Sequence, residues 1–236
     1  MPLPRFLMGP EFLIELIYSV VVMFSCLVIY FKTREIYNLS SYKSIKYFRM
    51  TFLFFAISYF LRFFSRVIML ALALSGPVFL PIGLSSLTTL LLVYTGLMTT
   101  FYLFYSISMK KLGKILPETT DYLHVLAVFI SSTVMFLNLA IIYVGISLLL
   151  LLIMLFLGYS EYVSSERKKS LSPFSIVYFL LILFLMLNIF DILTPGFFMG
   201  VRTMIYIASL FLFLLILYKV LKILRVESND RKKKQT

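Results

Sequence analysis

YLHVLAVFISSTVMFLNLAIIYVGISLLLLLIMLFL, residues 122–157, contains no Asp, Glu, Lys or Arg, and short basic stretches flank it at residues 110–114 and 167–169. As a single helix this run would be about 54 Å long at 1.5 Å per residue, and its basic flanks would lie on opposite sides of a membrane. Short loops rich in Lys and Arg stay on the cytoplasmic side. The run therefore has to cross twice, and we predict that it turns near Asn138, its one strongly polar side chain.

The same basic pattern extends over the whole chain. Of the 22 Lys and Arg residues, 18 fall in four stretches, at residues 32–49, 110–114, 167–169 and 219–234. The alternating connections hold neither Lys nor Arg, and they are residues 75–81, the region around 138 and residues 193–199. This alternation predicts a membrane topology in which the basic stretches are cytoplasmic.

Composition indicates a protein integral to a cell membrane that crosses it several times. Apolar residues make up 61% of the chain and charged residues 14%, and the mean hydropathy is +1.02. The net charge of +12 lies mostly at the ends of apolar runs, where Lys and Arg contact anionic lipid headgroups. We therefore expect membrane lipids, and no nucleic acid, as partners of the basic face.

We predict an all-α protein whose single domain, residues 1–226, is a bundle of seven transmembrane helices. About 20 apolar residues cross a hydrocarbon layer of roughly 30 Å as a helix. The N-terminus lies outside and the C-terminus in the cytoplasm, where residues 227–236 form a basic tail. The predicted spans are residues 11–32, 47–73, 80–109, 121–137, 139–160, 172–193 and 199–225.

Two arginines lie inside a predicted span, where topology does not explain them. Arg62 and Arg66 belong to the second span, and Arg62 lies about 16 Å from Thr51, where that span enters the hydrocarbon. An unpaired Arg near the midplane costs at least about 2.5 to 3.5 kcal/mol on insertion scales. Acidic partners or water should therefore be present.

We predict that these arginines meet acidic side chains in the outer half of the bundle. Arg66 follows Arg62 by one helical turn and faces the same side. The first, sixth and seventh spans supply polar residues at a comparable depth. The predicted cluster consists of Arg62, Arg66, Arg202, Glu11, Glu15, Asp191 and Asn188.

Two interpretations of this cluster remain open. It is either an ion-pair network that holds four helices together, or a polar cavity, open to the outside, in which the Arg pair binds a small anionic ligand by bidentate hydrogen bonds. Side chains of the second and third spans would line such a cavity, and the candidates are Tyr59, Tyr94 and Thr99.

The chain offers no catalytic, metal-binding or cofactor-binding motif. A single His and a single Cys cannot form the common zinc sites, and no phosphate-binding loop or nucleophile elbow occurs. His124 begins the fourth span beside Asp121, and we expect it at the cytoplasmic interface. We therefore expect a protein that is not an enzyme and carries no cofactor or metal.

Three functions fit these observations, and we rank a receptor-like or sensory module first. It would bind the anionic ligand outside and present its basic face to a protein partner inside the cell. A structural or assembly subunit of a membrane complex would need only the ion-pair network. A small-solute transporter is less favoured, because transporter sites are often built on helices interrupted by Pro or Gly, whereas all eight prolines here lie outside the spans or at their edges.

Overall fold

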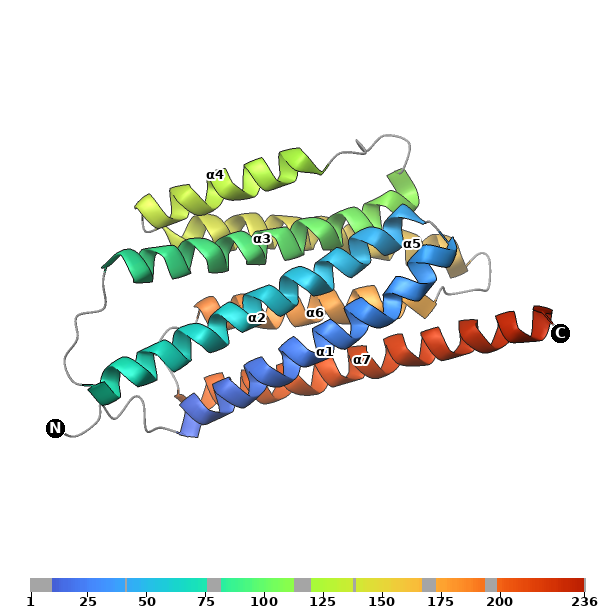
Figure 1. Ribbon diagram of the computed structural model, residues 1–236. Coiled ribbons are helices and arrows are strands. Elements are labelled where there is room, and N and C mark those ends of the chain that lie inside the picture. The colour runs from blue at the N-terminus through green and yellow to red at the C-terminus, as the bar shows by residue number, and fades with distance from the viewer. Residues whose placement is uncertain are drawn as a thin grey trace.

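In the part of the chain that the structure describes, every regular element is an α-helix. A computed structural model describes residues 10–40, 42–75, 82–112, 120–137, 139–166, 173–193 and 199–235. The helices follow one another along the chain (Figure 1) as α1 (Pro10–Ser40), α2 (Lys43–Ser75), α3 (Ile82–Leu112), α4 (Asp121–Leu137), α5 (Ala140–Glu166), α6 (Pro173–Leu193) and α7 (Met199–Gln235). The predicted all-α fold is thereby confirmed.

The apolar run of residues 122–157 forms two helices, as predicted. α4 ends at Leu137, and the Ile142 backbone N–H donates to the Leu139 carbonyl at 3.0 Å where α5 begins. Asn138 itself lies outside the described residues. No Gly or Pro marks this chain reversal. The two helices were predicted from the basic residues that flank the run, because no local turn signal is present.

Two helices continue well past the predicted spans. α1 runs through Lys32 and Arg34 to Ser40, and α7 runs to Gln235, through the stretch predicted as a basic tail. The predicted spans ended near the ends of the apolar runs, whereas Lys, Arg and Glu are themselves good helix formers and continue a helix past them. Figure 1 shows the C-terminal end of α7 projecting past the neighbouring helices.

The helices are those of a multi-pass membrane protein. Five described segments are long and apolar enough to cross a membrane, namely Phe12–Glu35, Lys43–Leu72, Ser86–Met109, Ile141–Ser160 and Val201–Arg225. α4 and α6 contribute the shorter apolar segments Asp121–Leu137 and Ser175–Asp191. Large apolar side chains such as Phe129 and Phe156, each 70% exposed, cover the outer faces of the bundle. Such a surface is stable in contact with lipid tails and not with water.

Six of the helices form a closed circuit of neighbours. α1 contacts α2 and α7, α2 contacts α3, α3 contacts α5, and α6 contacts both α5 and α7. α4 lies outside this circuit, against α3 and α5 (Figure 1). Across the circuit, the ring centroids of Phe55 on α2 and Phe184 on α6 are 5.5 Å apart. The centroids of Phe184 and Phe213 on α7 are 4.9 Å apart. These aromatic contacts bring α2 against α6 and α7.

α4 begins about two turns short of the C-terminal end of α3, where the Tyr122 and Tyr105 ring centroids lie 6.3 Å apart. Nδ1 of His124 lies 2.8 Å from the Tyr94 hydroxyl, and Nε2 lies 2.9 Å from the Tyr102 hydroxyl. Both tyrosines are at least seven residues inside the apolar segment Ser86–Met109. The expected place of His124 at the cytoplasmic interface stays a prediction, and the structure adds that two phenol hydroxyls of α3 contact its ring. Figure 1 shows α4 beginning well short of the C-terminal end of α3.

Gly96 of α3 permits a close contact with Tyr143 of α5. A Cβ at Gly96 would lie 2.5 Å from the Tyr143 hydroxyl oxygen, closer than real Cβ atoms approach another heavy atom. We predict that Gly96→Ala lowers the free energy of unfolding by about 1 to 3 kcal/mol, because an added methyl group displaces its packed neighbours. The single, buried Cys26 reports this change through its reaction with a thiol-specific dye during heating.

The matched control is Gly158→Ala, because a Cβ at Gly158 meets nothing within 4 Å. In the Gly96→Ala protein, the further substitution Tyr143→Phe removes the clashing oxygen and should recover much of the lost stability. Equal unfolding temperatures for Gly96→Ala and Gly158→Ala would contradict the proposed contact.

Candidate functional site

A polar cluster lies where the beginning of α1 meets the second half of α2. Nη2 of Arg66 lies 2.8 Å from Oε2 of Glu15 and 3.0 Å from its Oε1, so one nitrogen contacts both carboxylate oxygens. Nε of Arg62 lies 3.6 Å from the same Oε1. Because Arg62 and Arg66 are one turn apart on α2, both face α1 and share this acid. The Glu15 side chain is only 6% exposed.

Asp191, near the end of α6, is the second acid and joins two further cations. Nη2 of Arg62 donates to its Oδ2 at 2.5 Å, and Nε of Arg202 on α7 donates to its Oδ1 at 3.2 Å. Tyr206, one turn after Arg202, accepts from that Nε at 2.9 Å and donates to Oδ2 of Asp191 at 3.5 Å. The Asp191 side chain is 3% exposed. Its charge is therefore balanced by these protein groups.

Hydroxyl and amide groups extend the network toward the centre of the bundle. Tyr59 donates to Oδ1 of Asn188 at 2.7 Å, and the Tyr18 hydroxyl lies 2.7 Å from that of Tyr59. Nδ2 of Asn188 donates to the Phe184 carbonyl at 2.9 Å. The Tyr18 ring also stacks on Tyr206 of α7, with the ring centroids 5.3 Å apart. One connected set of side chains thus joins α1, α2, α6 and α7.

The charges of this cluster nearly balance. Among the described side chains, three guanidinium groups meet two carboxylates, which leaves one positive charge. Glu11, the third acid of the predicted cluster, has its side chain outside the described residues. Removing one partner of a buried pair leaves the other charge uncompensated and costs about 3 to 5 kcal/mol. The pairs therefore hold four helices together.

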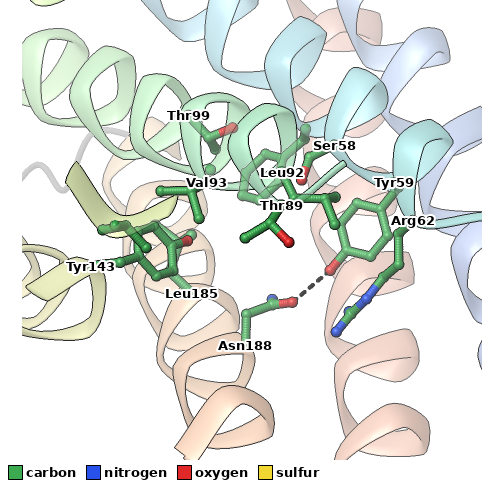
Figure 2. Close-up of a pocket in the computed structure, with 13 residues that line it drawn as sticks. Ser58, Tyr59, Arg62, Thr89, Leu92, Val93, Thr99, Tyr143, Leu185 and Asn188 are labelled. Atoms are coloured by element: carbon green, nitrogen blue, oxygen red, sulfur yellow. Dashed lines mark hydrogen bonds between the residues drawn. The ribbon is translucent and has the colours of Figure 1, made fainter. Parts of the chain in front are cut away.

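A cavity of about 310 Å³ adjoins the cluster. Figure 2 shows Tyr59 and Arg62 toward one side of it, with Asn188 hydrogen-bonded to Tyr59, and Val93 and Tyr143 toward the other. The volume is near the lower end of small-molecule sites, which span about 300 to 1,000 Å³. The remaining lining residues are Phe55, Ser58, Thr89, Leu92, Gly96, Thr99, Val134 and Leu185.

The structure brings together six of the seven residues predicted for the cluster, namely Arg62, Arg66, Arg202, Glu15, Asp191 and Asn188. Of the residues predicted to line a cavity, Tyr59 and Thr99 do so. Tyr94 does not, because its hydroxyl bonds to His124 of α4. Five residues separate Tyr94 from Thr99, which is about 140° around a helix, so the two side chains face different neighbours.

The sequence reasoning missed Tyr18 and Tyr206, which complete the hydrogen-bond network. Tyr206 follows Arg202 by four residues, and that spacing on a helix could have identified it as a partner. No comparable spacing in the sequence identifies Tyr18 as a member of the network. Its contacts, Tyr59 and Tyr206, come from helices remote in sequence.

The described side chains of this site can bind a carboxylate. An Arg guanidinium presents paired N–H groups that match the two oxygens of a carboxylate. The Tyr59 hydroxyl beside Arg62 donates its one proton to Asn188, and the Asn188 amide has a second N–H besides the one it donates to Phe184. Among the described residues, no group of three or more His, Cys, Asp or Glu side chains could hold a metal ion. The polar side of the cavity therefore suits an anion or another hydrogen-bond acceptor.

We predict that Asp191→Asn destabilises the protein by about 3 to 5 kcal/mol, because the substitution removes the negative charge that Arg62 and Arg202 share. Thermal unfolding in lipid nanodiscs, followed through Cys26, measures the effect. Asp121→Asn is the matched control, since Asp121 is exposed, and it should leave the free energy of unfolding within about 0.5 kcal/mol of the parent value.

A double-mutant cycle separates the ion pair from other effects of the substitution. Arg62→Gln combined with Asp191→Asn should cost less than the sum of the two single changes, because each single variant leaves one buried charge without its partner. Strictly additive losses would contradict an energetic coupling between the two side chains.

Comparison with known proteins identifies an archaeal relative. No protein-family model matches the chain, and no solved structure matches it significantly. A protein of Archaeoglobus fulgidus, described as uncharacterized, is 32% identical to it over 220 residues, which cover 88% of this chain and 91% of the relative. The similarity thus includes nearly the whole helical bundle, and the chain belongs to the same family as this archaeal protein.

Proposed function

We propose that the protein is a receptor-like module with seven transmembrane helices, and that its polar cluster faces the outside of the cell and binds a small anionic ligand. The alternation of basic and uncharged connections supports this orientation, with the N-terminus outside and the C-terminus in the cytoplasm. The basic ends of the helices would then meet anionic lipids and a protein partner that receives the signal.

One observation carries the proposal: Arg62 belongs both to the ion-pair network and to the wall of the cavity. Its side chain is 24% exposed, whereas those of its acidic partners are 6% exposed or less. A cation that served only to hold helices together would not need to face a cavity. Intramembrane ionisable groups are commonly functional.

The shared position of Arg62 supplies a route from binding to a change in helix contacts. An anion at Arg62 competes with Asp191 for the same N–H donors. Asp191 keeps a second cation, Arg202, while the α2 to α6 contact weakens. Ligand binding would thereby shift the balance between two arrangements of α2 against α6.

A structural or assembly role is the second candidate, and a different observation favours it. Each of the three arginines already has an acidic partner, and together the pairs join α1, α2, α6 and α7. A subunit whose helices only support a larger complex needs nothing more from this cluster. A transporter of small solutes is a third reading, which the described helices support less because their prolines lie only at first positions.

Binding of benzoate, a compact carboxylate, tests the receptor proposal. We expect benzoate to raise the unfolding temperature of the parent in nanodiscs made of zwitterionic lipid. Arg62→Gln should weaken this binding by about tenfold or more, because it removes a charge-assisted hydrogen bond worth about 1.5 to 3 kcal/mol. Isothermal titration gives the two dissociation constants.

Arg66→Gln is the matched control, because Arg66 belongs to the same ion-pair network but is not among the residues lining the cavity. It should weaken benzoate binding less than Arg62→Gln does, because of the two arginines only Arg62 lines the cavity. Equal weakening in both variants would indicate a general loss of packing. If the parent responds to no carboxylate, short or long, the structural role replaces the receptor role.

Cysteine labelling tests the seven spans and their orientation. In a Cys26→Ser background, single cysteines replace Ser75, Asn138, Lys169 or Gln235, and intact cells are treated with an impermeant maleimide. We expect labelling at the first two positions without permeabilisation, and at the last two only after it. Protection of position 138 in intact cells would mean that α4 and α5 do not cross as two separate spans.

A further inference from the structure

We propose that the ligand is a single-chain amphiphile, with a small singly charged acidic head against Arg62 and an uncharged apolar body in the rest of the cavity. The inference rests on the proposed function and specifies the class of molecule that the site would take. Three features of the cavity carry it: the position of its polar groups, the charges around Arg62, and the nature of the remaining wall.

The charged group and the amide of the cavity lie toward one side, and the hydroxyl residues Ser58, Thr89, Thr99 and Tyr143 complete its polar lining. Figure 2 shows the side chains of Tyr59, Arg62 and Asn188 toward one side, where the Tyr59 hydroxyl and the Asn188 amide are already bonded to each other. Arg62 is the only charged residue in the described wall. A ligand with one acidic end, and not one with charges at both ends, is complementary to this distribution.

The surroundings of Arg62 limit the charge of the head. Oδ2 of Asp191 lies 2.5 Å from its Nη2, and Oε1 of Glu15 lies 3.6 Å from its Nε. A head with two or three negative charges would be repelled by both carboxylates, and the low dielectric of the bundle strengthens that repulsion. A carboxylate, with one charge and two acceptor oxygens, reduces this repulsion and matches the paired N–H groups of a guanidinium.

The far side of the cavity is uncharged and mainly apolar. Figure 2 shows Val93 and Leu185 toward that side, and the other apolar side chains of the lining are Phe55, Leu92 and Val134. Tyr143 approaches α3 there, since a Cβ at Gly96 would lie 2.5 Å from its hydroxyl oxygen. A polar body would lose its hydration without gaining enough partners, whereas each methylene group that enters such a site improves binding.

Titration with a matched set of ligands tests the inference in nanodiscs of zwitterionic lipid. The set is butanoate, hexanoate, octanoate, octanol and octyltrimethylammonium, with affinities expressed against free aqueous concentration. We expect affinity to rise about fourfold for each methylene group from butanoate to octanoate. We expect octanol to bind about tenfold or more weakly than octanoate, and the cationic amphiphile not to compete.

Val93→Phe locates the body of the ligand, because a larger ring at this wall position fills the cavity and leaves the ion pairs in place. It should weaken octanoate binding by about tenfold or more. Leu87→Phe is the matched control on the same helix, since Leu87 is 52% exposed, and it should leave binding unchanged. The comparison among ligands on the parent protein stands even if Val93→Phe does not fold.

Failure of this inference is distinguishable from failure of the proposed function. If benzoate binds and the affinities of butanoate, hexanoate and octanoate are equal, the site takes an anion but no apolar body, and the amphiphile is excluded. Equal binding of octanol and octanoate likewise overturns the acidic head. If no carboxylate binds at all, both proposals fail.

The same acidic amphiphile could come from water or from the bilayer, and added lysophosphatidylglycerol, a single-chain lipid with one negative charge, separates the two sources. Octanoate affinity that is unchanged by this lipid supports a free amphiphile as the ligand. Octanoate that the lipid displaces in the parent, and not in Val93→Phe, supports entry of a lipid headgroup and chain from the membrane.

Discussion

A guanidinium group inside an apolar bundle is stable only beside a compensating negative charge, and Asp191 supplies that charge to Arg62. Arg62 lies ten residues inside the apolar segment Lys43–Leu72, where water is scarce. Its pairing with Asp191 and Glu15 sets how α1, α2 and α6 approach one another, and Arg202 adds α7. The register of four helices follows from the need to compensate these charges.

The cavity and the ion-pair network depend on the same side chain. Because α2 approaches α6 through Arg62, Tyr59 and Phe55, a space remains between this contact and α3. Gly96 and Tyr143 close its far wall by their near approach. A ligand in this space would act on the contact that holds α2 against α6, which is why a binding role and a structural role converge on Arg62.

Much of the cluster could be predicted because few charged residues lie inside the apolar segments, so each has few possible partners. Once the basic residues at the helix ends are assigned to one side, few charges remain, and the helical rise places Arg62 level with Glu15 and Asp191. The contacts of Tyr18 and Tyr94 could not be predicted in this way. Their partners depend on which faces of neighbouring helices meet, and an almost uniformly apolar helix gives little information about its rotation.

Local composition was enough to predict an all-α membrane protein and to divide the run at residues 122–157 into two helices, because hydrophobicity and charge act through neighbouring residues. The contacts of His124 with Tyr94 and Tyr102, and the cavity beside Arg62, could be identified only in the packed bundle. Both depend on side chains from different helices meeting in space, and the free energy of such contacts belongs to the pair and not to either residue alone.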